Sequence, residues 1–203
     1  VNPSVSVGEL TMEQVQQIYL GEITDWAEVG GEAGEIVVVS REDGSGTRGA
    51  FEEIVDFEDA LTANATLAEG NGGVQAKVAS TDNAIGYVSF TYLDDTIKPV
   101  LVNGAEPTVE NVLGGSYPVA RPFMIVYHED NLSDAAKEFL GFITSDVAKE
   151  IIVEKGGIAV SDEENAEPEE EMTVAGDVTV SGSTSVEKIG LALGDEFMAM
   201  YPD

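Results

Sequence analysis

The chain has 203 residues, of which 39 are Asp or Glu and 9 are Lys or Arg, so its formal charge is −30. Apolar residues make up 43 % of it, which is enough for a packed core and too much for a disordered chain. Clusters of Lys and Arg bind nucleic acids and anionic membranes, so this charge argues against both partners. The absence of cysteine excludes disulfides, thiolate zinc sites and a cysteine nucleophile.

Helical and strand patterns alternate along the chain, which predicts an α/β fold with a mixed sheet flanked by helices. Residues 10–20 carry apolar side chains at helical spacing behind a Thr11–Gln14 capping box, and Gly21 ends this helix. Residues 35–40 (EIVVVS) form a short β-branched run typical of a buried strand. In chain order, the predicted elements are helix 10–20, strand 35–40, helices 47–55 and 74–80, strands 84–90 and 97–102, helix 108–113, strand 123–127, and helices 133–144 and 145–155.

The composition changes abruptly at residues 162–171 (DEENAEPEEE), where seven of ten residues are acidic. We interpret this stretch as a self-repelling, solvated linker rather than a calcium site, because it offers no glycine turn to wrap a cation. Beyond it, residues 178–181 predict a strand, 182–185 a turn and 186–201 a helix. The apolar face of that helix comprises Ile189, Leu193, Phe197 and Met200. The expected organisation is therefore 1–161, the linker 162–171, and a further α/β segment 172–203.

No stretch approaches the roughly 18 continuous apolar residues of a membrane span, and the first ten residues lack the pattern of a signal peptide. We therefore interpret the chain as a piece of a longer protein. The single histidine, His128, lies among acidic neighbours without a glycine elbow nearby. A hydrolase is accordingly a weak hypothesis, and a surface position is expected for His128.

The loop at residues 40–48 (SREDGSGTR) lies between the strand 35–40 and the helix 47–55. Its glycines allow a tight turn, and the amides around Ser45, Gly46 and Thr47 then lie in the first helical turn, where they lack partners and favour an anion. Ser45 and Thr47 add hydroxyl donors, and Arg41 can bind two oxygens with its guanidinium. Asp43 could hold that guanidinium or accept a proton from the ligand.

Three other interpretations of this loop compete with an anion site. A plain connection in which Ser45 or Thr47 caps the helix is the simplest. An EF-hand aligned on Gly46 would put the cation Arg41 at the first ligand position, so we reject it. A nucleotide P-loop would need a Lys after the glycines, and none is present. No metal site or cofactor is predicted.

Residues 182–185 (GSTS) repeat the arrangement of strand, polar turn and amphipathic helix. Thr184 and Ser185 could direct hydroxyls and helix-start amides at an anion. An ordinary N-cap explains the pattern equally well. Exposed charges are screened beyond a Debye length of about 8 Å, so the acidic surface should slow an anion's approach without forbidding its binding.

Together these segments resemble the PstS-like phosphate-binding proteins of ABC-type phosphate importers. The resemblance rests on residues 10–31, on the loop VVVSREDGSGTRGAF at 37–51, on 71–90 and on 117–127, and residues 178–203 resemble the family's first strand and helix. It implies a type II periplasmic-binding-protein-like fold. It also implies phosphate ligands at Arg41, Ser45, Gly46, Thr47, Thr184 and Ser185, with Asp43 supporting Arg41.

The order of the segments departs from the family pattern, because the family's beginning lies at the end of this chain. Either residues 172–203 complete the same module in a rearranged order, or they begin a second, tandem copy. The first-lobe segment that follows the opening helix in the family is missing.

The resemblance implies a non-catalytic solute-binding protein that delivers phosphate to an ABC permease in the membrane. An extracellular or cell-surface location follows, with a membrane anchor such as that of a lipoprotein. The alternatives are a structural or adhesive surface domain that keeps the fold, or a binder of another tetrahedral oxyanion.

Overall fold

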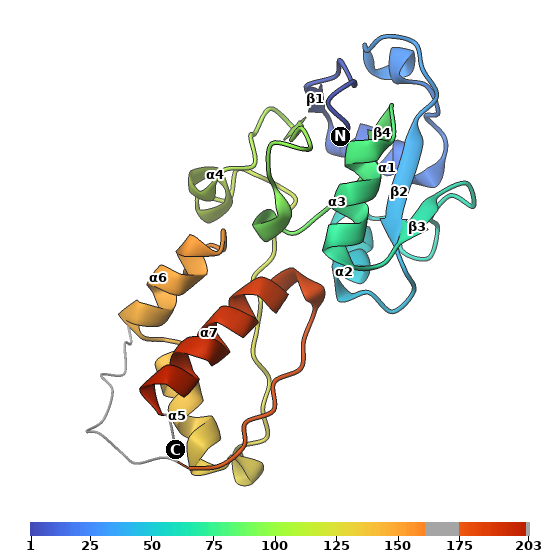
Figure 1. Ribbon diagram of the computed structural model, residues 1–203. Helices are drawn as coiled ribbons and strands as arrows, with labels where there is room; N and C mark the ends of the chain where they lie inside the picture. Colours follow the sequence, from blue (N-terminus) through green and yellow to red (C-terminus); the bar gives the residue numbers. More distant parts are fainter. Residues whose placement is uncertain (161–174, 202–203) are drawn as a thin grey trace. The chain divides into compact units, whose positions relative to one another are not determined.

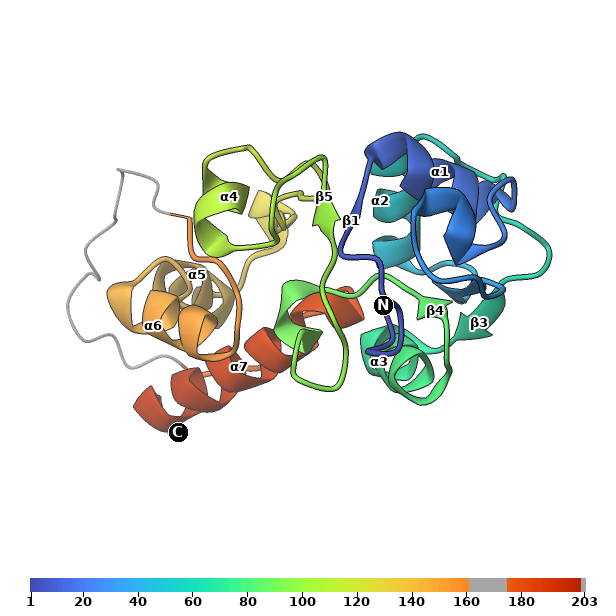
Figure 2. The ribbon, with the colours of Figure 1, turned by 90° about the horizontal axis from the view of Figure 1, so that it is seen from above.

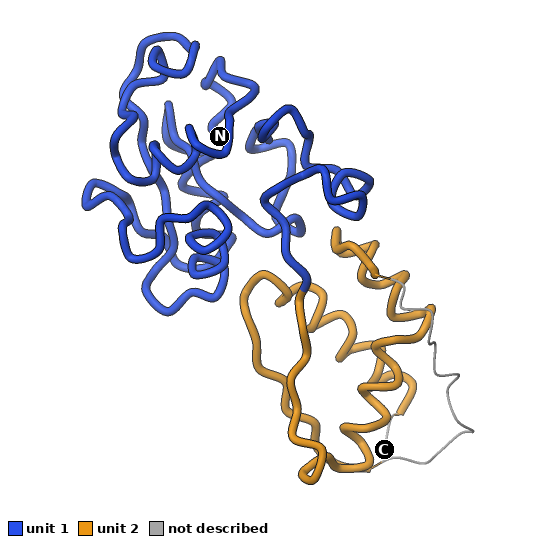
Figure 3. Tube along the Cα trace, turned by 180° about the vertical axis from the view of Figure 1, so that it is seen from behind, with its two compact units in different colours: residues 1–122 blue, residues 123–203 orange. Residues whose placement is uncertain are grey.

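The computed structural model describes residues 1–160 and 175–201, which belong to two compact units, residues 1–122 and 123–203 (Figure 3). The acidic stretch expected to be a linker lies outside the described residues. Each unit has its own buried apolar clusters. The two are therefore described separately.

A parallel sheet of three strands forms the centre of the first unit. Its strands are β2 (Val37–Arg41), β3 (Thr66–Ala68) and β4 (Ala84–Ile85), and β2 lies in the middle. Arg41 pairs with Ala68 at one end of β2, and Val37 pairs with Ala84 at the other. Two short strands, β1 (Glu9–Leu10) and β5 (Leu101–Val102), form a separate parallel pair.

Helices cover both faces of this sheet. Helices α1 (Met12–Leu20) and α2 (Gly46–Val55) lie on one face, and α3 (Gly70–Ser80) lies on the other (Figure 2). Because successive strand side chains point to opposite faces, Val38 packs with α1 and α2 while its neighbour Val39 packs with α3. Burial on both faces explains why the sequence of β2 is apolar throughout its centre.

The sequence determines the helix ends locally. The Thr11 hydroxyl accepts from the Gln14 N–H, and the Gln14 side chain accepts from the Thr11 N–H, so the predicted capping box is confirmed. Gly21 ends α1 with a φ of 78°, a left-handed conformation that glycine adopts without strain. Helix α3 begins four residues before its predicted start, because the glycine run at its N-terminus joins the helix.

The remaining elements of the first unit are short. The run 84–90 was predicted as one strand, but only Ala84–Ile85 pairs with β2, and Phe90–Tyr92 forms a 3-10 turn. Close packing accompanies the exit from β4, since a Cβ on Gly86 would lie 2.7 Å from Val78 Cγ2. The others are the 3-10 helix Trp26–Val29 and helix α4 (Val109–Leu113).

The second unit is helical in its described part. Helices α5 (Asp134–Phe142) and α6 (Asp146–Glu154) begin after the caps Ser133 and Ser145, as predicted, and α7 (Glu187–Met200) follows the 3-10 turn Thr184–Val186 (Figure 1). A 3-10 turn at Glu129–Asn131 precedes α5. The buried centre of this unit consists of Phe142, Ala148, Leu193 and Phe197. Met200, predicted to share that face, is half exposed.

Two strand predictions in this unit are wrong. Residues 123–127 (FMIVY) form no strand and lie exposed, with Val126 91 % accessible, and residues 178–181 likewise form no strand. A strand exists only where a neighbour satisfies its backbone groups, and the described residues provide no ladder for either segment. Apolar, β-branched composition alone therefore overpredicted them.

The α/β prediction, with helices flanking the sheet, is confirmed. The described ladders are parallel, and antiparallel pairing is limited to isolated bridges, Asp25 with Glu35 and Val102 with Ala105. Among the described helices, none combines the length and apolar character that crossing a bilayer requires.

Candidate functional site

The loop between β2 and α2 lies at a topological switch point of the sheet. The chain leaves β2 for α2 on one face, whereas it leaves the neighbouring strand β3 for α3 on the other face. Ligands of open α/β sheets bind outside the carboxyl ends of the strands at such points. The loops after β2 and β3 also touch here, since the Gly70 N–H donates to the Glu42 carboxylate at 3.3 Å.

The loop turns into α2 with the geometry expected of an anion site. Gly44 adopts a φ of 81°, and Ser45 is the N-cap, its Oγ accepting from the Arg48 N–H at 3.2 Å. Gly46 is the first residue of the ten-residue helix, so its amide belongs to the turn without i−4 partners. Ser45 therefore caps the helix, as the simplest interpretation held, and its hydroxyl hydrogen remains able to donate. Gly46 itself is exposed.

Arg41 is almost completely buried at the end of β2, with 2 % of its surface accessible. Its Nε and Nη2 donate to the two carboxylate oxygens of Glu42, each at 2.8 Å. The third nitrogen, Nη1, is buried and has no hydrogen-bond partner among the described residues. Burying a charged donor without a partner costs about 1–3 kcal/mol or more, so this nitrogen is a donor that an acceptor of a ligand could satisfy.

The partner of Arg41 differs from the expectation. Glu42 holds the guanidinium, while Asp43, predicted for that role, lies exposed and accepts from Arg48 Nη1 at 2.6 Å. Asp43 lies just before the left-handed turn at Gly44, and it pairs there with a residue of α2. The hydrogen bonds from Arg41 lower the pKa of Glu42 from 4.5 to about 2, so this carboxylate stays ionised at neutral pH.

All three arginines of the sequence contact this one loop. Arg48 donates to the Arg41 carbonyl at 3.2 Å and to Glu52 at 2.6 Å, and the hydrogen bond that it donates to Glu52 raises the pKa of Arg48. Arg121, far along the chain, donates to the Gly46 carbonyl at 3.1 Å. On a chain of charge −30, this concentrates the guanidinium groups at the first turn of α2.

The hydroxyl of Tyr87 fixes the backbone at the end of β2. The Tyr87 hydroxyl accepts from the Arg41 N–H at 3.2 Å and shares a hydrogen with Ser40 Oγ at 2.8 Å. Its ring stacks on Phe51 of α2, with centroids 4.0 Å apart, and burial raises its pKa so that it remains neutral. Sequence reasoning missed this residue, although its position two residues beyond β4 places it at the same edge of the sheet.

Glu42 and Arg121 were also missed. Glu42 carried a weak signal, because an acidic residue directly after the arginine is an obvious candidate partner. Arg121 lies 75 residues from its acceptor, and no local pattern could have indicated the contact.

The second predicted pair of ligands belongs to the second unit. Thr184 and Ser185 begin the 3-10 turn that leads into α7, and Ser183 is the cap, its Oγ accepting from the Ser185 N–H at 3.2 Å. Ser185 is 2 % accessible. The role of this pair toward a ligand stays a prediction.

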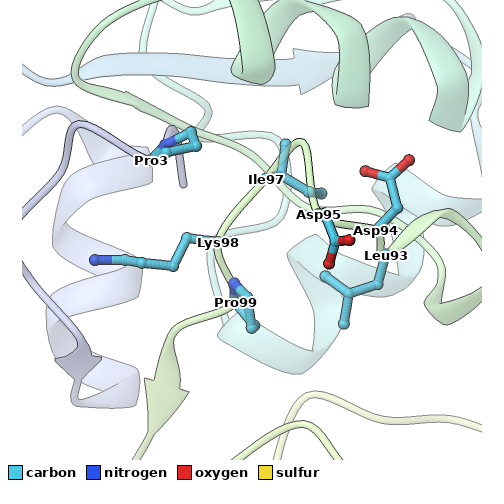
Figure 4. Close-up of a pocket in the computed structure, with 7 residues that line it drawn as sticks. All are labelled: Pro3, Leu93, Asp94, Asp95, Ile97, Lys98 and Pro99. Atoms are coloured by element: carbon cyan, nitrogen blue, oxygen red, sulfur yellow. The ribbon is translucent and has the colours of Figure 1, made fainter.

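Other features of the described residues suit an anion less well. A surface hollow of about 470 Å³ is bordered by Asp94, Asp95 and Lys98 together with apolar side chains (Figure 4), and its two carboxylates would repel an anion. Lys98 Nζ is already engaged with the Val5 carbonyl. His128 is exposed, as expected. No grouping of acidic and histidine side chains suited to a metal ion occurs in the two described ranges.

Comparison with known proteins gives consistent matches. Residues 1–147 match the family model described as PBP superfamily domain. The phosphate-binding protein PstS of Bacillus subtilis (strain 168) is 34 % identical over 164 residues, which are 80 % of this chain and 54 % of that protein. PstS 2 of Streptococcus pneumoniae TIGR4 is 32 % identical over 179 residues, 84 % of this chain and 60 % of the relative.

Solved structures of proteins from phosphate transporters also match this chain. A structure from Clostridium perfringens, described as a phosphate ABC transporter substrate-binding protein with bound phosphate, matches with a TM-score of 0.76 and 47 % identity, over 79 % of this chain and 67 % of that one. An ABC-type phosphate transport receptor from Vibrio cholerae matches with a TM-score of 0.70 and 35 % identity over the same shares. The chain thus spans little more than half the length of the first curated relatives it matches.

Proposed function

This chain belongs to the PBP superfamily domain family as a PstS-like member, and we propose that it binds inorganic phosphate, without catalysis, as the solute-binding component of an ABC-type phosphate uptake system. The relatives that it matches are named as a phosphate-binding protein and as a substrate-binding protein of an ABC transporter, a class that binds its solute without converting it. The similarity to these proteins supports the class of protein that we propose. The local geometry of the loop after β2 supports a tetrahedral oxyanion as the ligand.

The observation that supports phosphate most directly is Arg41 Nη1. This nitrogen is buried, charged and without a partner, at the carboxyl end of a central strand whose loop leads into the helix that Ser45 caps. Glu42 occupies the other edge of the guanidinium and fixes its plane. An oxygen of a bound anion would complete the donor set that the protein leaves open.

In the proposed site the remaining donors surround other oxygens of the anion. The Ser45 hydroxyl and the amides of Gly46 and Thr47 belong to the first turn of α2, where the helix dipole favours negative charge. Thr184 and Ser185 keep their proposed role as phosphate ligands, which the family resemblance implies. Asp43 keeps one proposed role, that of accepting a proton from a protonated ligand.

The proposed partner is the permease of the same transporter, since a solute-binding protein delivers its ligand to a membrane component. The protein would accordingly act outside the cytoplasmic membrane, attached to it as a lipoprotein or by another anchor of the parent chain. A second copy of the module in that parent remains part of the proposal. Nucleic acid is not a proposed partner, because the charge of −30 opposes it.

Calorimetric titration of the chain with phosphate tests the function. Arg41→Gln should weaken binding by about 10- to 100-fold, because each charge-assisted hydrogen bond contributes about 1.5–3 kcal/mol and 1.4 kcal/mol is a factor of ten. Lys77→Gln, which removes the same charge from an exposed position on α3, should leave the affinity unchanged. Equal affinity of the wild-type protein and Arg41→Gln would contradict the proposal. Competition by sulfate at equal concentration would favour a general oxyanion binder.

A further inference from the structure

Two of the eight asparagines in the sequence begin the pattern Asn-x-Ser/Thr, in which x is any residue except proline. They are Asn64 in NAT (64–66) and Asn131 in NLS (131–133), whereas Pro3 removes Asn2 from the pattern. In a protein that acts outside the cytoplasm, this pattern is an acceptor for N-linked glycans, which are attached to exposed loops. The local structure differs at the two positions, and the difference favours Asn64.

Asn64 is exposed and lies in the turn that precedes β3. Thr62 holds this turn, because its carbonyl accepts from the Ala65 N–H at 3.1 Å and its Oγ1 accepts from the Asn64 N–H at 3.4 Å. Thr62 is itself anchored to α1, since its N–H donates to the Tyr19 carbonyl at 2.9 Å. The asparagine is therefore presented to solvent from a fixed turn.

The two patterns differ in how the protein uses their polar side chains. Within the described ranges, the Asn64 amide group and the Thr66 hydroxyl make no hydrogen bond. Ser133 of the second pattern is engaged, because its Oγ caps α5 by accepting from the Ala136 N–H at 3.1 Å. Asn131 is also the last residue of the 3-10 turn before α5. The first pattern thus offers both of its polar groups to a transferase, whereas the second has its hydroxyl committed to a helix cap.

We propose that Asn64 is an N-glycosylation site and that the sugar donor is a lipid-linked sugar pyrophosphate. In the transfer, Asn64 Nδ2 forms a bond to C1 of the first sugar, and the bond from C1 to the pyrophosphate oxygen breaks. Nδ2 loses one proton to the transferase, the lipid pyrophosphate leaves, and no oxidant or reductant takes part. The inference rests on the location outside the cytoplasmic membrane that is part of the proposed function, and not on phosphate binding.

A glycan on Asn64 would lie beside an open edge of the sheet. Among the described strands β3 is an edge strand (Figure 1), and it carries neither a charge nor a proline, which commonly protect such edges. Leu67 of this strand is 53 % exposed. Asn64 precedes the amino end of β3, whereas Arg41 pairs with Ala68 at its carboxyl end. The glycan would therefore shield the strand without occupying the loop after β2.

Mass spectrometry of the protein from the cells that naturally produce it tests the proposal. The peptide that contains Asn64 should carry the mass of a glycan, and the peptide that contains Asn131 should not. An unmodified Asn64 peptide, or a glycan on Asn131 instead, would overturn the proposal. The readout is the mass of a peptide, so it is independent of whether the protein binds phosphate.

Transfer in vitro tests whether the folded protein presents the site. The purified full chain is incubated with a lipid-linked oligosaccharide and an oligosaccharyltransferase chosen because it modifies a peptide of residues 60–69. The chain should gain one glycan, which Asn64→Gln and Thr66→Ala should lose. Thr66→Ser and Asn131→Gln should keep it. The fluorescence of Trp26, which is buried in the same unit, should be unchanged in all four variants and so separates a folding defect from loss of the acceptor. Modification of the peptide but not of the folded chain would overturn the proposal.

Discussion

Arg41 and Arg48 lie seven residues apart and satisfy their guanidinium groups in different ways. Arg48 donates to Asp43, Glu52 and the Arg41 carbonyl, so it braces the loop. Arg41 is paired along one edge only, by Glu42, and Nη1 has no protein acceptor in the described ranges. Arg48 thus braces the loop, whereas Arg41 keeps a donor for the ligand that we propose.

Glu42 should make an acid-sensitive contribution to stability. Its pKa falls from 4.5 to about 2 on folding, so the contribution is fully present above pH 4.5 and is lost as the pH falls toward 2. The difference in free energy of unfolding between the wild-type protein and Glu42→Gln should therefore be constant near neutral pH and shrink below about pH 4.5. Urea unfolding followed by Trp26 fluorescence measures it.

The control for Glu42 is Glu53→Gln, at an exposed position on α2. It removes the same charge without an arginine partner, so it separates the ion pair from the general relief of repulsion in a chain of charge −30. A wild-type to Glu42→Gln difference that stays the same from pH 7 to 2 would contradict the assigned pairing.

At the scale of elements, the site depends on how closely α3 packs against the sheet. Gly86 directly follows β4, and a Cβ there would lie within 2.8 Å of both Val74 and Val78 of α3. Tyr87, which holds the Arg41 backbone, is the next residue. The packing of α3 and the position of the site loop are therefore coupled through one turn.

Gly86→Ala should destabilise the first unit by about 1–3 kcal/mol, the usual cost of overpacking a core. Gly49→Ala provides the opposite case, because a Cβ at this position in α2 meets nothing within 4 Å and alanine favours the helix by about 0.5–1 kcal/mol. Thermal unfolding followed by Trp26 fluorescence should thus shift down for the first variant and up for the second. Equal shifts for the two variants would contradict the close packing of Gly86 against α3.

The elements also show what the sequence can predict. Helices 10–20, 47–55, 133–144 and 145–155 were predicted correctly because their caps and apolar spacing are local signals. Strands 123–127 and 178–181 were not, because pairing depends on distant partners that composition does not reveal. The same limit explains the site. The position of the loop at 40–48 between a strand and a helix could be predicted from the sequence, whereas the contacts of Glu42, Tyr87 and Arg121 depend on which side chains folding brings together.

For the whole molecule, the main question is how a chain of charge −30 would admit the anion that we propose. The three arginines and the start of α2 supply short-range attraction, while the exposed carboxylates repel at longer range. Screening shortens the range of the repulsion from about 30 Å at 0.01 M salt to about 8 Å at 0.15 M. Directed hydrogen bonds at contact distance are affected much less.

The association rate for phosphate should therefore rise with ionic strength, contrary to the usual fall for oppositely charged partners. Because the chain has no cysteine, Glu53→Cys on α2 gives a unique attachment point for a fluorescent reporter in stopped-flow measurements. Uncharged additives of equal osmolarity serve as the control. A rate that falls as salt increases would mean that local attraction already dominates at long range.

Phosphate binding at the loop after β2 is tested most directly by titrating the isotopically labelled chain with phosphate and following it by nuclear magnetic resonance. It observes the amides of Gly46 and Thr47 together with the Arg41 guanidinium. We expect these signals to shift together and saturate, and the shifts to disappear in Arg41→Gln but persist in Lys77→Gln. Saturable shifts elsewhere with these signals unmoved, or no difference between the two variants, would contradict this expectation.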